Sequence, residues 1–199
     1  MKPEQIGQAY NQIADLWDKQ TFNNNNGIAQ HERAIGFTDK RGAALDVGCG
    51  WNGRFIDLLL GKGFAPEGLD ISGEMISRAR KGHPDVTFYQ DDICDWQPLK
   101  QYDFITAWDS IWHVPLDRHE RVLEKIFAAL APGGVCIFSA GGLDEPSDQV
   151  DDFMGPEVYY SALGVPKLLE VIAASGCICR HLEYDQRPEV HLYLIVQKA

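Results

Sequence analysis

The stretch Ala44-Leu45-Asp46-Val47-Gly48-Cys49-Gly50-Trp51-Asn52-Gly53 decides the fold of this chain. Its apolar start, which ends in Asp46-Val47, has the length and composition of a buried strand. The glycines that follow form a G-x-G-x-x-G loop, and the apolar run at residues 55–60 predicts a helix that ends at Gly61. Glycine lacks the Cβ atom that keeps a ligand at a distance, so the loop is either a nucleotide site or a tight turn without a ligand.

An acidic residue downstream of the loop favours the nucleotide site. Asp70 ends the next apolar segment, residues 65–70. This position is close to the spacing of about 20 residues at which an acidic side chain meets a ribose hydroxyl after such a loop. Two features at matched positions therefore favour a bound nucleotide over a turn alone.

Five segments, taken in order, resemble the class I, Rossmann-like S-adenosylmethionine-dependent methyltransferases. They are Leu45-Asp46-Val47-Gly48-Cys49-Gly50, Gly68-Leu69-Asp70-Ile71-Ser72 followed by Met75, Gln90-Asp91-Asp92-Ile93, Tyr102-Asp103-Phe104-Ile105-Thr106-Ala107 and Leu130-Ala131-Pro132-Gly133-Gly134. The resemblance covers residues 40–140 and is weaker outside them. It implies an α/β, doubly wound fold with a mostly parallel seven-stranded sheet, helices on both faces and a C-terminal antiparallel hairpin.

The resemblance also implies a cofactor, S-adenosylmethionine, which leaves as S-adenosylhomocysteine. The glycine loop would hold the methionine portion, Asp70 the ribose, and Asp92 the adenine amino group. The implied cofactor-binding residues are Tyr10, Trp17, Asp46, Gly48, Cys49, Gly50, Asp70, Ile71, Met75, Asp92, Ile93, Ala107 and Trp108. For Tyr10 and Trp17 the alternative is that both aromatics anchor an amphipathic N-terminal helix to the core.

Catalysis would need few dedicated residues. A methyl group on a positively charged sulfur moves by in-line displacement, so the protein mainly aligns the acceptor and excludes water. If the acceptor is an acidic hydroxyl or an amine, a base would help, and His113, just beyond the fourth predicted strand, is the first candidate. His191 in the final hairpin is a second candidate and Tyr160 a third. A structural role is the alternative for both histidines.

The acceptor is expected to be a small molecule. Methyltransferases that act on base amines of nucleic acids, or on glutamine in proteins, carry Asn or Asp followed by Pro-Pro and an aromatic residue after the fourth strand, whereas this chain has Ala107-Trp108-Asp109-Ser110. The formal net charge of -11 also argues against a polyanionic partner, so neither nucleic acid nor an acidic membrane surface is expected. The sequence does not predict the oligomeric state.

Cysteine usage and hydropathy indicate the compartment. The five cysteines are an odd number and none forms a C-x-x-C pair, so we expect reduced thiols and no metal site. The N-terminus has no apolar signal region, and no segment approaches the uninterrupted run of about 18 apolar residues that a membrane span needs. We therefore expect a cytoplasmic protein.

The chain is expected to form a single domain over its 199 residues. The expected parts are a helical cap at 1–39, a cofactor-binding core at 40–140, a possible substrate lid at 141–165, and a helix with a closing hairpin at 166–199. Residues 141–164 depart from the alternation of strands and helices and predict a long loop. This loop is either a lid whose aromatics close over the substrate or a mobile acidic loop.

Local signals predict three helix boundaries. Ser72 is the expected N-cap of a helix at residues 74–80. Asp117 with Glu120 resembles a capping pair that opens a helix with Leu130 on its apolar face. The Pro-Gly-Gly run at residues 132–134 is expected to stop that helix.

Two other functions remain open from the sequence. A nicotinamide-dependent oxidoreductase shares the glycine loop and Asp70 but has no use for the 91–93 pattern, and its sheet continues with parallel strands where this chain predicts a hairpin. A non-catalytic protein that binds or senses S-adenosylmethionine has the same cofactor residues. Only an acceptor screen distinguishes that protein from an enzyme.

Overall fold

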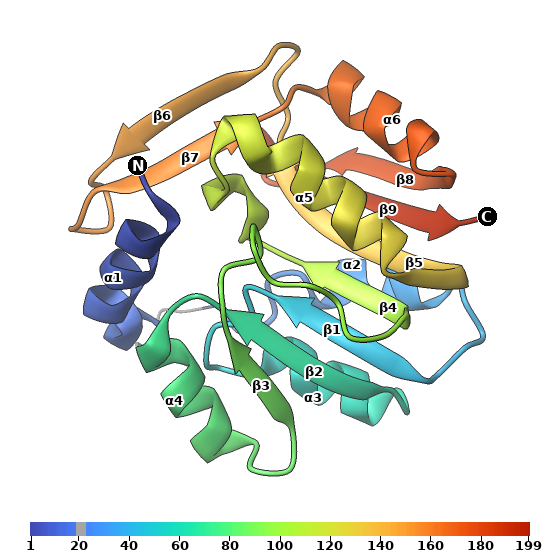
Figure 1. Cartoon of the computed structure of the whole chain (residues 1–199), viewed down its shortest axis with the longest axis horizontal. Helices are drawn as coiled ribbons and strands as arrows, with labels where there is room; N and C mark the ends of the chain where they lie inside the picture. Colours follow the sequence, from blue (N-terminus) through green and yellow to red (C-terminus); the bar gives the residue numbers. More distant parts are fainter. Residues whose placement is uncertain (19–22) are drawn as a thin grey trace.

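The centre of the molecule is a seven-stranded sheet with strand order β3-β2-β1-β4-β5-β9-β8 (Figure 1). Its strands are β1 (Ala43–Val47), β2 (Ala65–Asp70), β3 (Thr87–Gln90), β4 (Tyr102–Ala107), β5 (Leu130–Gly141), β8 (Cys177–Tyr184) and β9 (His191–Lys198). The first five pair in parallel, and β9 runs antiparallel to β5 and β8. The predicted sheet and its closing hairpin are confirmed.

The computed structural model describes residues 1–18 and 23–199, except the side chains of Trp17 and Asp18. The helices are α1 (Pro3–Ile13), α2 (Ile28–Ile35), α3 (Arg54–Gly61), α4 (Gly73–Gly82), α5 (Leu116–Ala128) and α6 (Val165–Ala174), with short 3-10 helices η1 (Ala14–Asp18) and η2 (Ile111–His113). None of the helices in this described part is long and apolar enough to cross a bilayer.

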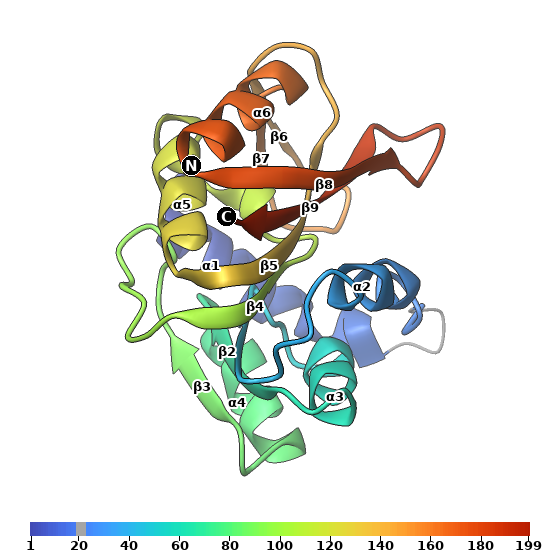
Figure 2. The same cartoon turned by 90° about the vertical axis from the view of Figure 1, so that its right-hand side faces the viewer.

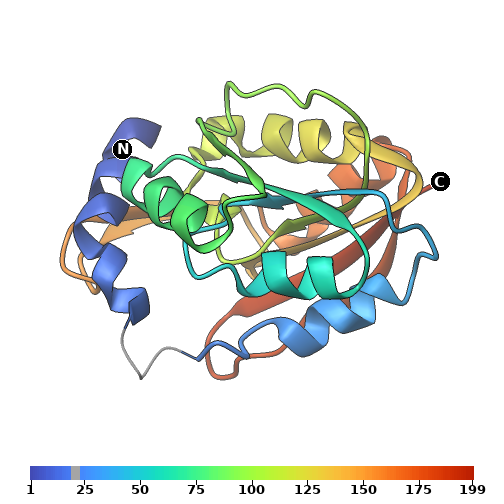
Figure 3. The same ribbon diagram turned by 90° about the horizontal axis from the view of Figure 1, so that it is seen from below.

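Helices cover both faces of the sheet, as predicted. Figure 2 shows α2 and α3 on one face and α5 and α6 on the other, and Figure 3 shows α5 and α3 separated by the sheet in a view from below. Helix α1 lies instead at the edge where the parallel strands end, in contact with α4. This placement puts an N-terminal helix beside the carboxyl ends of the strands.

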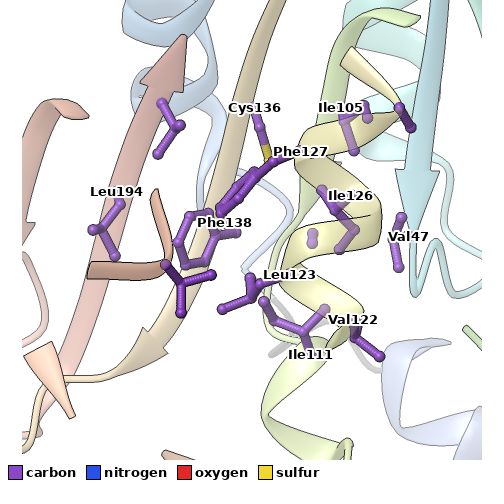
Figure 4. Packing of buried hydrophobic residues seen from close by; sticks show 14 of the residues in the cluster. Val47, Ile105, Ile111, Val122, Leu123, Ile126, Phe127, Cys136, Phe138 and Leu194 are labelled. Carbon is purple, nitrogen blue, oxygen red and sulfur yellow. The ribbon is translucent and has the colours of Figure 1, made fainter. Parts of the chain in front are cut away.

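The two faces of the sheet belong to two separate hydrophobic clusters, because alternate residues of a strand point to opposite sides. On the α5 face, Leu123, Ile126 and Phe127 of the helix pack with Ile105 of β4 and Phe138 of β5 (Figure 4). None of these five side chains is more than 2% exposed. Burial of each stabilises the fold by roughly 1.5–3 kcal/mol, so α5 is firmly fixed relative to the central strands.

Residues 141–165 form a second sheet of two strands where the sequence predicted a long loop. β6 (Ser147–Asp151) pairs antiparallel with β7 (Val158–Ala162). β7 is largely buried because Val158 and Tyr159 pack with Ile6 of α1, whereas β6 is largely exposed. The partner of β7 lies at the other end of the chain, so no local sequence signal showed that this segment has a surface to pack against.

The predicted capping pair at the start of α5 was wrong. Pro115 is the N-cap residue, and no side chain of the cap accepts a hydrogen bond there. Instead the N–H of Leu116 donates to the hydroxyl of Tyr159 from β7 (3.1 Å). A tertiary contact thus satisfies a helix N-terminus that Asp117 and Glu120 were expected to cap.

The end of α5 also differs from the prediction, because Leu130 begins β5 and does not lie on the helix. Tyr102 pairs with Leu130 and Phe104 with Val135, so residues 131–134 bulge out of the strand pair. Gly133 takes a φ of 74° in this bulge, a conformation that glycine adopts readily. The Pro-Gly-Gly run therefore shapes the start of β5.

Candidate functional site

A cavity of about 340 Å³ lies at the carboxyl ends of the parallel strands. The loops after β1, β2, β3 and β4 form one part of its wall, and α1, the β6–β7 hairpin and the β8–β9 turn form the rest. β1 and β4 are neighbours in the sheet although β2 and β3 follow β1 in the chain. Open α/β sheets bind their ligands at this topological switch point.

Most of the residues predicted from the sequence lie in this wall. They are Tyr10, Gly48, Cys49, Gly50, Asp70, Ile71, Met75, Asp92, Ile93, Trp108, His113, Tyr160 and His191. Asp46 and Ala107 do not line the cavity, and they are 2% and 0% exposed within β1 and β4. Burial raises the pKa of Asp46 to about 7, against the opposing charge of Arg54. The side chain of Trp17 lies outside the described part of the structure.

The glycine loop uses backbone conformations that favour glycine. Gly48, Gly50 and Gly53 have φ values of 72°, 57° and 68°. A Cβ atom at Gly48 would lie 2.2 Å from the Cβ of Ser110, whereas one at Gly50 would meet nothing within 4 Å. The loop is therefore closely packed at its first glycine and open at its second.

The Asp70 carboxylate connects the end of β2 to the glycine loop. It accepts hydrogen bonds from the backbone N–H groups of Gly50 (2.9 Å) and Ser72 (2.8 Å). Burial raises the pKa of Asp70, and these hydrogen bonds act in the opposite direction. The Ser72 hydroxyl accepts from the N–H of Met75 (3.1 Å), which confirms the predicted N-cap of α4. Asp70 thus has a fixed orientation in the cavity wall.

His113 is held as a neutral imidazole. The indole N–H of Trp112 donates to its Nε2 (3.0 Å), and the Tyr10 hydroxyl lies 2.7 Å from the same atom. Because an indole nitrogen only donates, Nε2 carries no proton, and the proton on Nδ1 is donated to the carbonyl oxygen of Tyr159 (2.8 Å). Burial lowers the pKa of His113 to about 4, with the Tyr159 carbonyl acting against that shift.

His191 is held as an imidazolium. Its Nδ1 lies 2.5 Å from the Asp185 carboxylate and its Nε2 lies 3.0 Å from that of Asp109. Burial disfavours the charge, but the hydrogen bonds and charges of Asp109 and then Asp185 raise the pKa of His191 overall. Both ring nitrogens donate, so this side chain links the β8–β9 turn to the end of β4.

The two tyrosines of the wall keep their protons. Burial raises the pKa of Tyr160 to about 12, and burial together with the neighbouring Tyr160 raises that of Tyr10 well above its usual value. The rings of Tyr160 and His113 lie 4.9 Å apart. Both phenols are therefore hydrogen-bond donors at neutral pH.

A profile of the methyltransferase domain family matches residues 27–162 of the chain. The chain belongs to this family. The predicted resemblance to class I S-adenosylmethionine-dependent methyltransferases is confirmed, since the sheet order, the glycine loop and the closing hairpin all agree with it.

Relatives of this methyltransferase include trans-aconitate 2-methyltransferases. The protein from Acidovorax sp. (strain JS42) is 39% identical over 109 residues, which are 53% of this chain and 41% of that protein. The one from Methylobacterium nodulans is 30% identical over 146 residues, which are 71% of this chain and 53% of that protein. The chain thus spans about half of the length of these relatives or less.

Solved structures resemble the methyltransferase over nearly its whole length. The DhpI–SAH complex is 26% identical, with a TM-score of 0.73 over 98% of this chain and 96% of that chain. An S-adenosylmethionine-dependent methyltransferase from Clostridium acetobutylicum ATCC 824 is 16% identical, with a TM-score of 0.75 over 96% of this chain and 99% of that chain. The second likeness is one of fold.

The sequence analysis missed Asp109 in the wall of the methyltransferase. This residue has a φ of 52°, a left-handed conformation that is uncommon outside glycine and clusters at functional sites. Its carboxylate accepts hydrogen bonds from Asn26 (3.1 Å) and Ser139 (3.2 Å) as well as from His191. A signal was available, because Asp109 directly follows the fourth predicted strand.

Two buried donors in the wall have no partner within the described part of the methyltransferase. They are Nδ2 of Asn52 and the indole Nε1 of Trp108. Arg54 lines the same wall, with its guanidinium 3.4 Å from Asn52 Oδ1 and 4.3 Å from the centre of the Phe55 ring. A buried unpaired donor costs about 1–3 kcal/mol, so a ligand that accepts from these groups removes that cost. The described residues include no cluster of His, Cys, Asp or Glu that could hold a metal ion.

Proposed function

We propose that this methyltransferase binds S-adenosylmethionine in the cavity and transfers its methyl group to a small molecule held beside it. The observation that carries the proposal is that one wall joins the glycine loop, Asp70 and Asp92 to an aromatic compartment with Tyr10, Trp112 and Tyr160. We call the wall residues within 47–55, 69–75 and 91–94, with Trp108, the cofactor side. The wall residues within 3–10, 109–115, 154–160 and 186–191 form the acceptor side.

The cofactor side suits the functional groups of S-adenosylmethionine. The unpaired donors of Asn52 and Trp108, with Arg54 beside Asn52, suit a carboxylate. The Asp70 carboxylate suits ribose hydroxyls, and that of Asp92 suits an exocyclic amino group. Each polar end of the cofactor thus has a group of matching hydrogen-bond character.

The chain's own residues have limited tasks, because the bound cofactor would supply a methyl group already activated on a cationic sulfur. Once the acceptor displaces the donors of Trp112 and Tyr10, the unprotonated Nε2 of His113 accepts the proton that leaves an acceptor hydroxyl or amine. Tyr160 donates a hydrogen bond to the acceptor. His191 already donates from both nitrogens, so its task is to hold Asp109. Helix α1 and the β6–β7 hairpin keep water out.

The charge on the acceptor side favours a neutral or cationic acceptor. Asp109 and Glu189 contribute carboxylates, and His191 is the one cation among the described residues of this side. Its charge is balanced by Asp109 and Asp185. The aromatic faces of Tyr10 and Trp112 suit an amine, through attraction between a cation and a ring.

Calorimetric titration of the purified protein with S-adenosylmethionine, S-adenosylhomocysteine and NADH tests the cofactor. We expect binding of the two adenosyl ligands and none of NADH. Binding of NADH alone would instead indicate that the glycine loop belongs to an oxidoreductase. Release of S-adenosylhomocysteine with a panel of amines, hydroxy compounds and trans-aconitate then tests the acceptor. Binding without release on any member favours the non-catalytic sensor, and faster release with trans-aconitate than with the amines overturns the charge argument.

A further inference from the structure

Three backbone carbonyl groups converge on one lysine of α5. The ammonium of Lys125 donates to the carbonyl oxygens of Ile93 (2.8 Å), Cys94 (2.9 Å) and Trp96 (2.8 Å). An ammonium has three N–H donors and no acceptor, so all of its donors are used. Lys125 is half-buried, on the helix whose apolar face is fixed against the central sheet.

The turn that Lys125 holds is part of the cavity wall. Asp92, Ile93 and Cys94 line the cavity, so Lys125 contacts the backbone of two of these residues. Within the turn, the carbonyl of Asp92 accepts from the N–H groups of Asp95 (2.9 Å) and Trp96 (2.7 Å). The Asp92 carboxylate accepts from the N–H of Cys94 (2.8 Å). The position of this carboxylate therefore depends on the shape of the turn.

The convergence of carbonyl groups needs a cation to be stable. Their oxygens carry partial negative charge, so without Lys125 they would repel one another and turn toward water. The turn also meets α5 through Arg118 and Asp95, which form a long, exposed ion pair (3.5 Å). Exposed pairs of this kind contribute about 0–1 kcal/mol, so Lys125 is the main polar link between the turn and α5, and Trp96 adds apolar packing in the core cluster of that helix.

We propose that Lys125 is the positioning residue that sets the base selectivity of the cofactor site, by fixing the 92–96 turn so that Asp92 accepts a hydrogen bond from the adenine amino group. This inference rests on the proposed function. A carboxylate held rigidly favours a base that presents a donor and disfavours one that presents an oxygen at the same place. A carboxylate on a loosened turn shifts or admits water, and it discriminates less.

The test compares S-adenosylhomocysteine with S-inosylhomocysteine, in which oxygen replaces the exocyclic amino group. Dissociation constants for both are measured by calorimetry on the wild-type chain and on Lys125→Met, which keeps an unbranched side chain one atom shorter and has no donors. We expect the wild-type chain to prefer the adenosyl ligand, and we expect the ratio of the two dissociation constants to shrink about tenfold in the variant. The matched control is Lys100→Met, since Lys100 follows the same turn but pairs with Glu67 (2.7 Å). This control should keep the wild-type preference.

The ratio of the two constants separates positioning from stability. If Lys125→Met weakens both ligands equally and leaves the preference unchanged, Lys125 is merely structural and the inference is overturned, while the proposed function stands. If the wild-type chain binds both ligands equally, Asp92 does not select the adenine amino group, and the inference is overturned. A wild-type chain that binds neither overturns the proposed function itself.

A second variant covers the case in which Lys125→Met does not fold. Lys125→Arg keeps the charge, but its planar group cannot direct three donors at three converging oxygens as an ammonium does. We expect a folded protein that retains part of the preference. A full wild-type preference in Lys125→Arg would show that charge alone suffices and would overturn the positioning role.

Discussion

The two sides of the cavity are built in different ways. On the cofactor side, the carboxylates are fixed by backbone N–H groups of the loops, since Asp70 accepts from Gly50 and Ser72, and Asp92 from Cys94. On the acceptor side, side-chain contacts join distant segments, as when Tyr10 meets His113 or His191 meets Asp109, in addition to local contacts such as that of Trp112 with His113. Local backbone geometry thus shapes the cofactor side, and tertiary packing assembles the acceptor side.

Because of this difference, mutations on the two sides should have different effects. A change on the cofactor side acts on the loop itself and should affect ligand affinity and folding together. A change on the acceptor side acts on contacts between elements, so it should alter catalysis or the docking of the hairpin while the central sheet persists. The predictions that follow test this separation, from the largest expected effect to the smallest.

Gly48→Ala should be the most damaging single change. The added Cβ meets Ser110 at 2.2 Å, and the φ of 72° strains any side chain. Overpacking costs typically 1–3 kcal/mol and the left-handed backbone about 1–2 more, so we expect the free energy of unfolding in urea to fall by about 2–5 kcal/mol. Gly50→Ala is the control, because its Cβ meets open space and only the backbone cost applies. Equal losses in the two variants would contradict the tight packing at Gly48.

Low pH should destabilise β7, which borders the acceptor side, before it destabilises the strands of the cofactor side. His113 donates to the Tyr159 carbonyl and His119 to the Ser161 hydroxyl (3.0 Å), and both partners lie on β7. Burial lowers the pKa of each histidine to about 4. The neutral forms therefore favour the folded state, and their contribution is complete above about pH 6.5 and is lost as the pH falls toward 4.

Each shift corresponds to roughly 3 kcal/mol at full protonation. Amide hydrogen exchange, corrected for the intrinsic effect of pH, should show weaker protection of β7 at pH 4.5 than at pH 7, with β1 and β4 unchanged. His119→Gln should reduce this pH dependence, and His83→Gln, a histidine paired with Asp57 outside the cavity wall, should not. Uniform loss of protection across all strands would show that the two sides unfold as one unit.

Asp70→Ala should weaken S-adenosylhomocysteine binding by about 10 to 100-fold, because it removes a buried acceptor worth about 1–3 kcal/mol. The variant also leaves the N–H groups of Gly50 and Ser72 without their acceptor, so its Tm should fall as well. Asp91→Ala is the matched control, since Asp91 lies in the same wall but, among the residues that the structure describes, accepts only from the adjacent N–H of Asp92 (2.8 Å). Unchanged affinity in Asp70→Ala would remove the ribose assignment.

The same division explains what the sequence could and could not predict. The glycine loop, the Ser72 cap and the place of Asp70 follow from patterns within a few residues or from one strand–loop–helix unit, and the seven-stranded sheet was implied by the family resemblance. The β6–β7 hairpin and the contact of Tyr159 with the start of α5 depend on the arrival of α1 from the other end of the chain. His191 was a candidate base from its residue type, but its charge depends on Asp109 and Asp185, which meet it only in the folded chain.

The smallest effect we predict is on turnover at His113. With the acceptor identified by the screen, His113→Ala should lower kcat by about tenfold and leave the Kd of S-adenosylhomocysteine unchanged. General bases commonly contribute more than this, but burial lowers the pKa of His113 to about 4, which makes Nε2 a weak proton acceptor. For the same reason, the wild-type rate should be level from pH 6 to 8 and should fall only as the imidazole becomes protonated at lower pH. Tyr10→Phe is the matched variant, since it removes the hydroxyl 2.7 Å from Nε2 but keeps the ring. If His113→Ala changes the affinity for S-adenosylhomocysteine and not kcat, His113 contacts the cofactor, and η2 belongs to the cofactor side of the cavity and not to the acceptor side.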